Sequence, residues 1–249
     1  MKYLYAIVFA IAVFQTSFAQ QEEIDTDRPD QTETPTIVPA NHFQMENGFL
    51  HQQNAKSESE LALPTSLWKF GVSKNLEIRV TTDLIYNKSK DSTSTGLSPI
   101  VAGIKVRLWD EKGVIPQASL ITQVLLPKVA SNELKVKYLA PELRLLFQNE
   151  ITDDIDLGYN LGMKWDGEST DPTFEYTISP NMNLTDKLKA YIEIYGFMPQ
   201  QRHPEEWFDG GFMFLLTKNV QLDISAGYEI TSTNNHHQFF ESIGFSFRI

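Results

Sequence analysis

Apolar and polar residues alternate along most of this chain, in runs of about ten residues that begin near residue 42 and continue to the last residue, Ile249. A period of two residues predicts β-strands whose two faces meet different surroundings. Asparagine, aspartate, threonine, lysine and glycine gather between the runs, and these residue types suit tight turns. The runs that we interpret as strands span residues 42–53, 61–72, 76–86, 98–108, 114–127, 134–150, 155–166, 172–184, 188–198, 206–216, 220–231 and 238–249.

The connections between these runs alternate between short and long. Short turns lie at 73–75, 110–113, 152–154, 185–187 and 217–219, and longer connections lie at 54–60, 87–97, 128–133, 167–171, 199–205 and 232–237. Outer-membrane barrels have an even number of strands, short periplasmic turns and longer external loops. The pattern predicts an all-β fold, a transmembrane antiparallel up-and-down β-barrel of about 12 strands of the outer-membrane type. Closing it requires run 238–249 to pair with residues 43–52.

Charged residues keep to one face of four predicted strands, 76–86, 98–108, 155–166 and 220–231. In the run 220–231, for example, Leu222, Ile224 and Tyr228 alternate with Asp223 and Glu229. Because a lysine or arginine that faces lipid near the midplane costs about 2–4 kcal/mol, we expect the apolar positions outside and the polar positions inside. The residues predicted to line the pore are Glu77, Arg79, Lys105, Arg107, Glu142, Arg144, Asp156, Lys164, Glu175, Lys189, Tyr191, Glu193, Tyr195, Asp223, Glu229 and Arg248.

Two interpretations of the inward charges stay open. They can act as an electrostatic filter for solutes, or they can pair across strands and brace a narrow barrel, which we favour for most of them. Tyr191 and Tyr195, with Phe197, also have two possible orientations. They face the lumen in one register and the lipid if the strand is shifted by one residue.

Three residues in the strands carry local expectations. Pro64 and Pro141 each predict a bulge, because proline lacks the amide donor of a sheet. Trp207 lies near a strand end and is expected, with other aromatic residues at strand ends, in an interfacial girdle.

The chain divides into three parts. Residues 1–19 combine Lys2 with an apolar run at 4–14 and the small-x-small ending at 17–19, which predicts a signal peptide. Residues 20–41 are polar, contain three prolines and lack a strand or helix period, so we expect a periplasmic N-terminal segment that is disordered or lies against the barrel. Residues 42–249 form the barrel.

Composition narrows the possible functions. The formal net charge is −11, with 32 acidic against 21 basic residues, which disfavours nucleic acid as a partner. The chain has no cysteine, so disulfides, thiolate metal sites and a lipid anchor on cysteine are excluded. Common hydrolase, zinc-protease and nucleotide-binding motifs are missing, and we therefore expect no catalytic residues, no cofactor and no enzyme activity.

The N-terminal segment carries the most specific motif, Asp25, Thr26, Asp27, Arg28, Pro29 and Asp30. Together with residues 43–48 and 69–79, it resembles a bacterial family of transporters of the meta-pathway of phenol degradation. The resemblance implies an outer-membrane barrel that passes aromatic or other hydrophobic compounds.

The acidic residues Asp25, Asp27, Asp30 and Glu33 allow two interpretations. Carboxylates bind calcium, but the segment lacks the glycine turn and ligand order of an EF-hand loop. We favour a segment that docks in the barrel mouth or on a partner, and we expect no metal site.

These observations together predict an outer-membrane channel for passive uptake of small, aromatic or hydrophobic, molecules. The alternative is a non-transporting barrel with a structural or interaction role in the cell envelope. We expect a monomer in the outer membrane of a Gram-negative bacterium, inserted by the barrel-assembly machinery, with both termini in the periplasm. Its expected partners are membrane lipid and a small-molecule solute.

Overall fold

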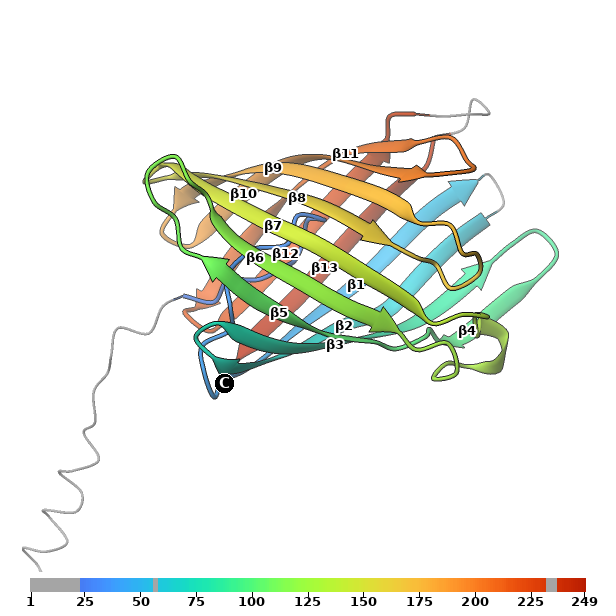
Figure 1. Cartoon of the computed structure of the whole chain (residues 1–249). Helices are drawn as coiled ribbons and strands as arrows, with labels where there is room; N and C mark the ends of the chain where they lie inside the picture. The colour runs from blue at the N-terminus through green and yellow to red at the C-terminus, as the bar shows by residue number, and fades with distance from the viewer. Residues whose placement is uncertain (1–22, 56–57, 232–236) are drawn as a thin grey trace, which may run out of the picture.

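A computed structural model describes residues 23–55, 58–231 and 237–249, and the predicted signal peptide lies outside these ranges. The described chain folds into an antiparallel β-barrel (Figure 1). Its strands are β1 (Phe43–Ala55), β2 (Glu58–Ser73), β3 (Leu76–Lys88), β4 (Thr93–Leu97), β5 (Val101–Trp109), β6 (Gln117–Leu125), β7 (Ala140–Thr152), β8 (Ile155–Lys164), β9 (Thr173–Thr185), β10 (Leu188–Pro199), β11 (Glu205–Thr217), β12 (Val220–Glu229) and β13 (Phe239–Arg248). Within these ranges no helix is long and apolar enough to cross a membrane.

The sheet closes on itself as a 12-stranded barrel. Neighbouring strands follow chain order, and β1 closes the ring by pairing with both β2 and β13. The pairs Gln44–Arg248 and Gln53–Phe239 bound the β1–β13 seam, which confirms the predicted closure of the last run against the first. The short β4 and the longer β5 both pair with β3, along different parts of its length. These two segments therefore occupy one position in the barrel.

Several predicted boundaries differ from the structure. The long connections expected at 54–60 and 87–97 are largely strand, because β1 and β2 extend toward each other and β4 pairs with the end of β3. The strand expected from 134 begins only at Ala140, after a 3-10 helix at Asn132–Leu134. A register shift between Ala62 and Thr65 confirms the bulge at Pro64. The bulge expected at Pro141 was wrong, because this proline is the second residue of β7 and the ladder there is regular.

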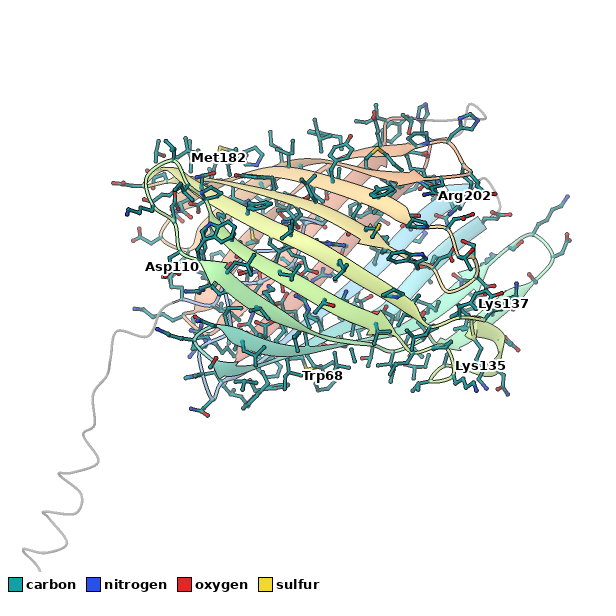
Figure 2. All side chains as sticks on the ribbon, viewed as in Figure 1. Trp68, Asp110, Lys135, Lys137, Met182 and Arg202 are labelled. Carbon is teal, nitrogen blue, oxygen red and sulfur yellow. The ribbon has the colours of Figure 1, made fainter. Side chains whose placement is uncertain are left out.

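Side chains sort between the two faces as the alternation predicted. On β12, Ile224 and Tyr228 on the outer wall are 54% and 49% exposed, whereas Asp223 and Ser225 on the inner wall are buried. Trp68 likewise projects outward from β2 (Figure 2). Soluble monomers rarely expose continuous apolar surface of this extent, so the outer wall is suited to lipid.

The two ends of the barrel differ. At one end, here called the turn end, connections such as 74–75, 153–154 and 186–187 are short. The other end, the loop end, carries longer connections such as 126–139 and 165–172. In Figure 2, Asp110 marks the turn end, and Lys137 and Arg202 mark the loop end. The C-terminal Ile249 lies at the turn end, where its amide donates to the carbonyl of Phe43.

A charge on the outer wall is expected to destabilise the barrel in lipid. Ile224 is the fifth residue of the ten-residue β12, near the middle of the apolar wall. Ile224→Arg should cost about 2–4 kcal/mol of folding free energy. Urea titration of the barrel refolded in lipid vesicles, followed by tryptophan fluorescence, measures this loss. The control is Val114→Arg, in the connection 110–116, where the side chain is 94% exposed and little change is expected.

Candidate functional site: a closed lumen

The N-terminal segment, residues 23–42, lies inside the barrel. It enters at the turn end, where the Ile24 amide donates to the carbonyl of Lys218 at 2.7 Å, and leaves there as well, where the Asn41 amide donates to the carbonyl of Gly71 at 2.8 Å. Between these points it loops up to side chains near the middle of the strands, such as Glu193 of β10. In Figure 1 it is the blue segment inside the half of the barrel that holds the C-terminus. The segment thus reaches well beyond the barrel mouth.

The lumen wall is electrostatically divided. All sixteen residues predicted to line the pore occupy inward-facing strand positions. Basic side chains gather on β2, β3, β5 and β7, and acidic ones on β9 to β12. The basic group contains Lys69, Arg79, Lys105 and Arg144, and the acidic group contains Glu175, Glu193, Asp209 and Asp223. Some of these charges brace the wall, since Arg144 pairs with Glu142 at 3.1 Å and with Glu175 at 2.5 Å.

Asp27 binds the basic wall. Its two carboxylate oxygens lie 2.9 Å from the ammonium groups of Lys69 and Lys105, and Arg79 Nη2 lies at 3.6 Å. The backbone amide of Asp27 donates to Glu46, which also pairs with Lys69. Burial raises the pKa of Asp27, but the charges of Lys105, Lys69 and Arg79 outweigh it and hold this pKa well below its ordinary value. Asp27 is therefore a buried carboxylate that stays ionised.

Arg28 reaches the opposite wall. Its Nη2 atom donates to Asp223 Oδ1 at 2.9 Å and to Ser242 Oγ at 2.8 Å. Gly48 and Gly244 lie beside the guanidinium, and a Cβ atom at either position would overlap it. Both glycines therefore provide the space through which Arg28 crosses to β12 and β13.

The next residues contact strands further round the barrel. Glu33 pairs with Arg79 Nη1 at 2.7 Å, and its backbone amide and carbonyl both hydrogen-bond the side-chain amide of Asn160. Thr32 donates to Glu193 at 2.5 Å and lies 2.6 Å from the hydroxyl of Thr177. The segment is thus anchored to strands on every side of the lumen.

Asp30 is the exception to this charge complementarity. It accepts a hydrogen bond from Ser179 at 2.9 Å, but it faces the acidic wall at Glu193 and Asp209. Burial and the charge of Glu193, with a smaller contribution from Asp209, raise the pKa of Asp30 well above its ordinary value. Asp30 therefore docks against Glu193 and Asp209 most favourably when its carboxyl group is protonated.

Little space remains around the segment. The cavity between residues 24–34 and the wall measures about 70 Å³, and the one beside residues 36–39 about 20 Å³. Ligand pockets for drug-sized molecules measure about 300–1,000 Å³. Neither of these two cavities has room for a drug-sized solute beside the segment.

Aromatic side chains line the lumen nearer the loop end. Tyr195, Trp207 and Phe240 form a buried cluster, against which Leu50 and Phe197 pack. The Tyr195 and Trp207 rings stack with centroids 6.0 Å apart. This arrangement settles the open register of β10, since Tyr191 and Tyr195 are 2% and 4% exposed and face inward. The girdle position expected for Trp207 was wrong, because this residue shares the inward face of β11 with Asp209.

Sequence reasoning missed several residues of the site. Lys69, Glu46 and Asp209 were absent from the predicted pore residues, although each is almost fully buried on the inner wall. Strand parity was the available signal, because Lys69 alternates with Trp68 and Phe70 on β2. The sequence carries no comparable signal for which wall residues the N-terminal segment contacts, because the segment has no strand or helix period from which its path could be predicted.

The closed barrel and its polar lumen define the class as an outer-membrane-type β-barrel with an internal N-terminal segment. A family model described as "Putative MetA-pathway of phenol degradation" matches residues 26–249, and the chain belongs to this family. The match begins within the N-terminal segment, at Thr26, so the family model includes most of the residues that fill the lumen.

Solved structures share the architecture at very low sequence identity. The COG4313 outer membrane channel from Pseudomonas putida F1 is 9% identical, with 91% of this chain and 100% of that chain covered and a TM-score of 0.69. The NanC porin is 9% identical, with 82% and 100% covered and a TM-score of 0.59. The KdgM porin, solved in complex with disordered oligogalacturonate, is 9% identical, with 81% and 98% covered and a TM-score of 0.54. A search of curated proteins found no match.

Removing the Asp27 carboxylate should release the segment. Asp27→Ala leaves Lys69, Lys105 and Arg79 buried with unbalanced charge, and the expected loss of docking free energy is on the order of 3 kcal/mol. Hydrogen exchange of the segment amides measures it, because the amides of Arg28 and Gln31 donate to wall carboxylates. The matched control is Asp25→Ala, at an exposed aspartate two residues earlier. Equal protection in the two variants would contradict the central role of Asp27.

Docking of the segment should weaken as the pH rises. Because the pKa of Asp30 is raised in the docked state, the docked segment keeps a proton that the released segment loses near the ordinary value of 3.8. The stabilisation is complete below that value and is lost as the pH rises through the raised pKa. Asp27 does not oppose this effect. Because its pKa is lowered in the docked state, its contribution to docking is lost only as the pH falls below the ordinary range of a carboxylate.

Asp30→Asn is the matched variant for this pH dependence. Asparagine keeps an acceptor for Ser179 and carries no charge, so the segment should exchange more slowly than wild type at about pH 8 and similarly at about pH 5. Exchange rates are compared after correction for the intrinsic effect of pH. A wild-type segment whose corrected protection stays constant over this range would contradict the expected role of Asp30.

Proposed function

We propose that this protein is an outer-membrane channel for passive uptake of small, aromatic or otherwise hydrophobic molecules, and that its N-terminal segment must be displaced for a solute to pass. One observation carries the proposal: the segment fills the lumen without adding a strand to the sheet. Between Asp25 and Ala40, every hydrogen bond described between segment and wall involves a side chain. The segment can therefore leave while the barrel stays closed.

The interior of the barrel supports a solute with an apolar part. A molecule that enters at the loop end meets the rings of Tyr195, Trp207 and Phe240 before it reaches the polar segment. Aromatic side chains bind flat apolar molecules by stacking and edge contacts, which add to the gain from buried area. Family membership and the shared architecture of the COG4313 channel and the NanC and KdgM porins add support for transport.

The proposed orientation follows from the two ends of the barrel. Outer-membrane barrels place their short turns in the periplasm. The turn end, with both entry points of the segment and the C-terminus, would then face the periplasm, and the aromatic cluster would face the outside. The apolar outer wall suits a monomer surrounded by lipid that the barrel-assembly machinery has inserted. A channel also fits the lumen better than an enzyme, because most buried charges there already have partners.

A disulfide that holds the segment in place tests the proposal. The hydroxyl oxygens of Thr32 and Thr177 lie 2.6 Å apart, so cysteines at these positions can bring their sulfurs close to the 2.05 Å of a disulfide. The chain has no cysteine of its own, and Thr32→Cys with Thr177→Cys therefore gives a single bond. Phenol crosses phospholipid without a channel, so its flux is measured into vesicles with a lipopolysaccharide outer leaflet and corrected for the flux into protein-free vesicles. The corrected flux should be blocked when the bond is oxidised and restored by reductant.

The two single variants, which cannot form the bond, are the controls and should conduct under both conditions. Equal flux in the oxidised and reduced double variant would show that solutes bypass the segment. Absence of flux in wild type and in every variant would favour the second candidate, a sealed barrel with a structural role in the envelope. The observation that favours this second candidate is the small volume left beside the segment in the lumen.

A further inference from the structure

Three basic side chains form a pocket in the inner wall. Lys69 of β2, Arg79 of β3 and Lys105 of β5, here called the cation pocket, come from three neighbouring strands and are 1%, 2% and 0% exposed. Lys69 and Arg79 are directly paired in the β2–β3 ladder. Buried cations need an anion of matching geometry, because an unpaired charge in a low-dielectric interior is very costly.

The carboxylate of Asp27 occupies this pocket in the closed state. Its Oδ1 atom lies 2.9 Å from Lys105 Nζ, and its Oδ2 atom lies 2.9 Å from Lys69 Nζ and 3.6 Å from Arg79 Nη2. Charge-assisted contacts to both oxygens are how proteins bind a free carboxylate. Asp27 belongs to the segment that must move, so its carboxylate is a removable occupant of the pocket.

The wall cannot fully replace this occupant. Lys105 hydrogen-bonds only to Asp27 and to the carbonyl of Thr34 among the described residues, and both belong to the N-terminal segment. The acids of the wall nearest the pocket are Glu46 and Glu77, two carboxylates against three cations. Glu33 of the segment, which pairs with Arg79 at 2.7 Å, leaves together with Asp27. Among the wall residues of the pocket one positive charge is then left over, and this excess corresponds to a single carboxylate.

We propose that the cation pocket is the binding site for a carboxylate group of the transported solute, which competes with Asp27 for Lys69, Arg79 and Lys105. This inference rests on the proposed channel function and narrows its solute to a monocarboxylate. The ring cluster of Tyr195, Trp207 and Phe240 on the path to the pocket favours an aromatic carboxylate.

The opposite wall argues for one negative charge and no more. Glu193, Asp209 and Asp223 line it, and only Asp223 has a basic partner, Arg28 of the segment, among the ion pairs of the described chain. Once the segment leaves, these acids repel any further anionic group of a solute. A monocarboxylate whose uncharged ring points away from the cation pocket avoids that repulsion.

Benzoate and benzamide are matched probes, since they share size and ring and differ in charge. We expect benzoate to speed hydrogen exchange of residues 27–34 in the wild-type barrel by about tenfold relative to benzamide, the size expected for one charge-assisted contact. Sodium chloride at the same ionic strength corrects for general screening of ion pairs. Equal exchange with benzoate, benzamide and salt would overturn the inference.

Lys105→Met supplies the second arm. It removes the cation that depends on the segment, so baseline exchange should rise while the difference between benzoate and benzamide disappears. Lys74→Met, at an exposed lysine in the turn between β2 and β3, should keep the wild-type difference. A benzoate effect that survives Lys105→Met would place the carboxylate elsewhere and overturn the inference.

Flux separates this inference from the proposed function. Transport of both probes at equal rates above that of protein-free vesicles, sensitive to the disulfide of the Thr32→Cys, Thr177→Cys variant, would leave a channel without carboxylate recognition. No transport of either probe in the reduced protein would count against the channel itself.

Discussion

Compensation of buried charge is the constraint on which the rest of this structure depends. Closing twelve strands into a narrow barrel turns one face of every strand inward, where water is scarce and each charge requires a partner. Lys69, Arg79 and Lys105 are the clearest example, because their wall acids, Glu46 and Glu77, are one too few. Asp27 supplies the missing charge from a part of the chain outside the sheet. The N-terminal segment is therefore part of the electrostatics of the barrel wall.

The alternation of residues was sufficient to predict the barrel, its strand number and its seam, because lipid on one side and a polar lumen on the other impose a two-residue period. Exceptions occurred where another constraint acts. Pro141 gave no bulge because β7 begins just before it. Trp207 lies two residues from the inward-facing Asp209 on β11, so strand alternation turns it inward although it is close to a strand end. The path of residues 23–42 was beyond prediction, since its contacts, such as Thr32 with Thr177, join positions far apart in sequence without periodicity.

The division of the lumen into a basic and an acidic wall explains the order of residues in the segment. Asp27 and Arg28 are adjacent in sequence, and successive side chains of an extended chain point in opposite directions. One residue therefore binds the cations of β2, β3 and β5, and the next binds Asp223 on β12. Gly48 and Gly244 keep the space beside Arg28 free. A dipeptide of opposite charges is thus a compact way to bridge a lumen whose walls carry opposite charges.

A segment that closes a channel must dock firmly and still be able to leave. This segment combines attractive contacts between opposite charges with one repulsive contact between like charges. Asp27, Arg28 and Glu33 each meet an opposite charge, whereas Asp30 meets Glu193 and Asp209. Net docking is a small difference between large electrostatic contributions, since desolvation offsets much of what each buried pair gains. A modest competitor for a single contact can then shift the equilibrium, provided that it satisfies the charges the segment leaves behind. The contact with the strongest need for a replacement anion is the one at Asp27.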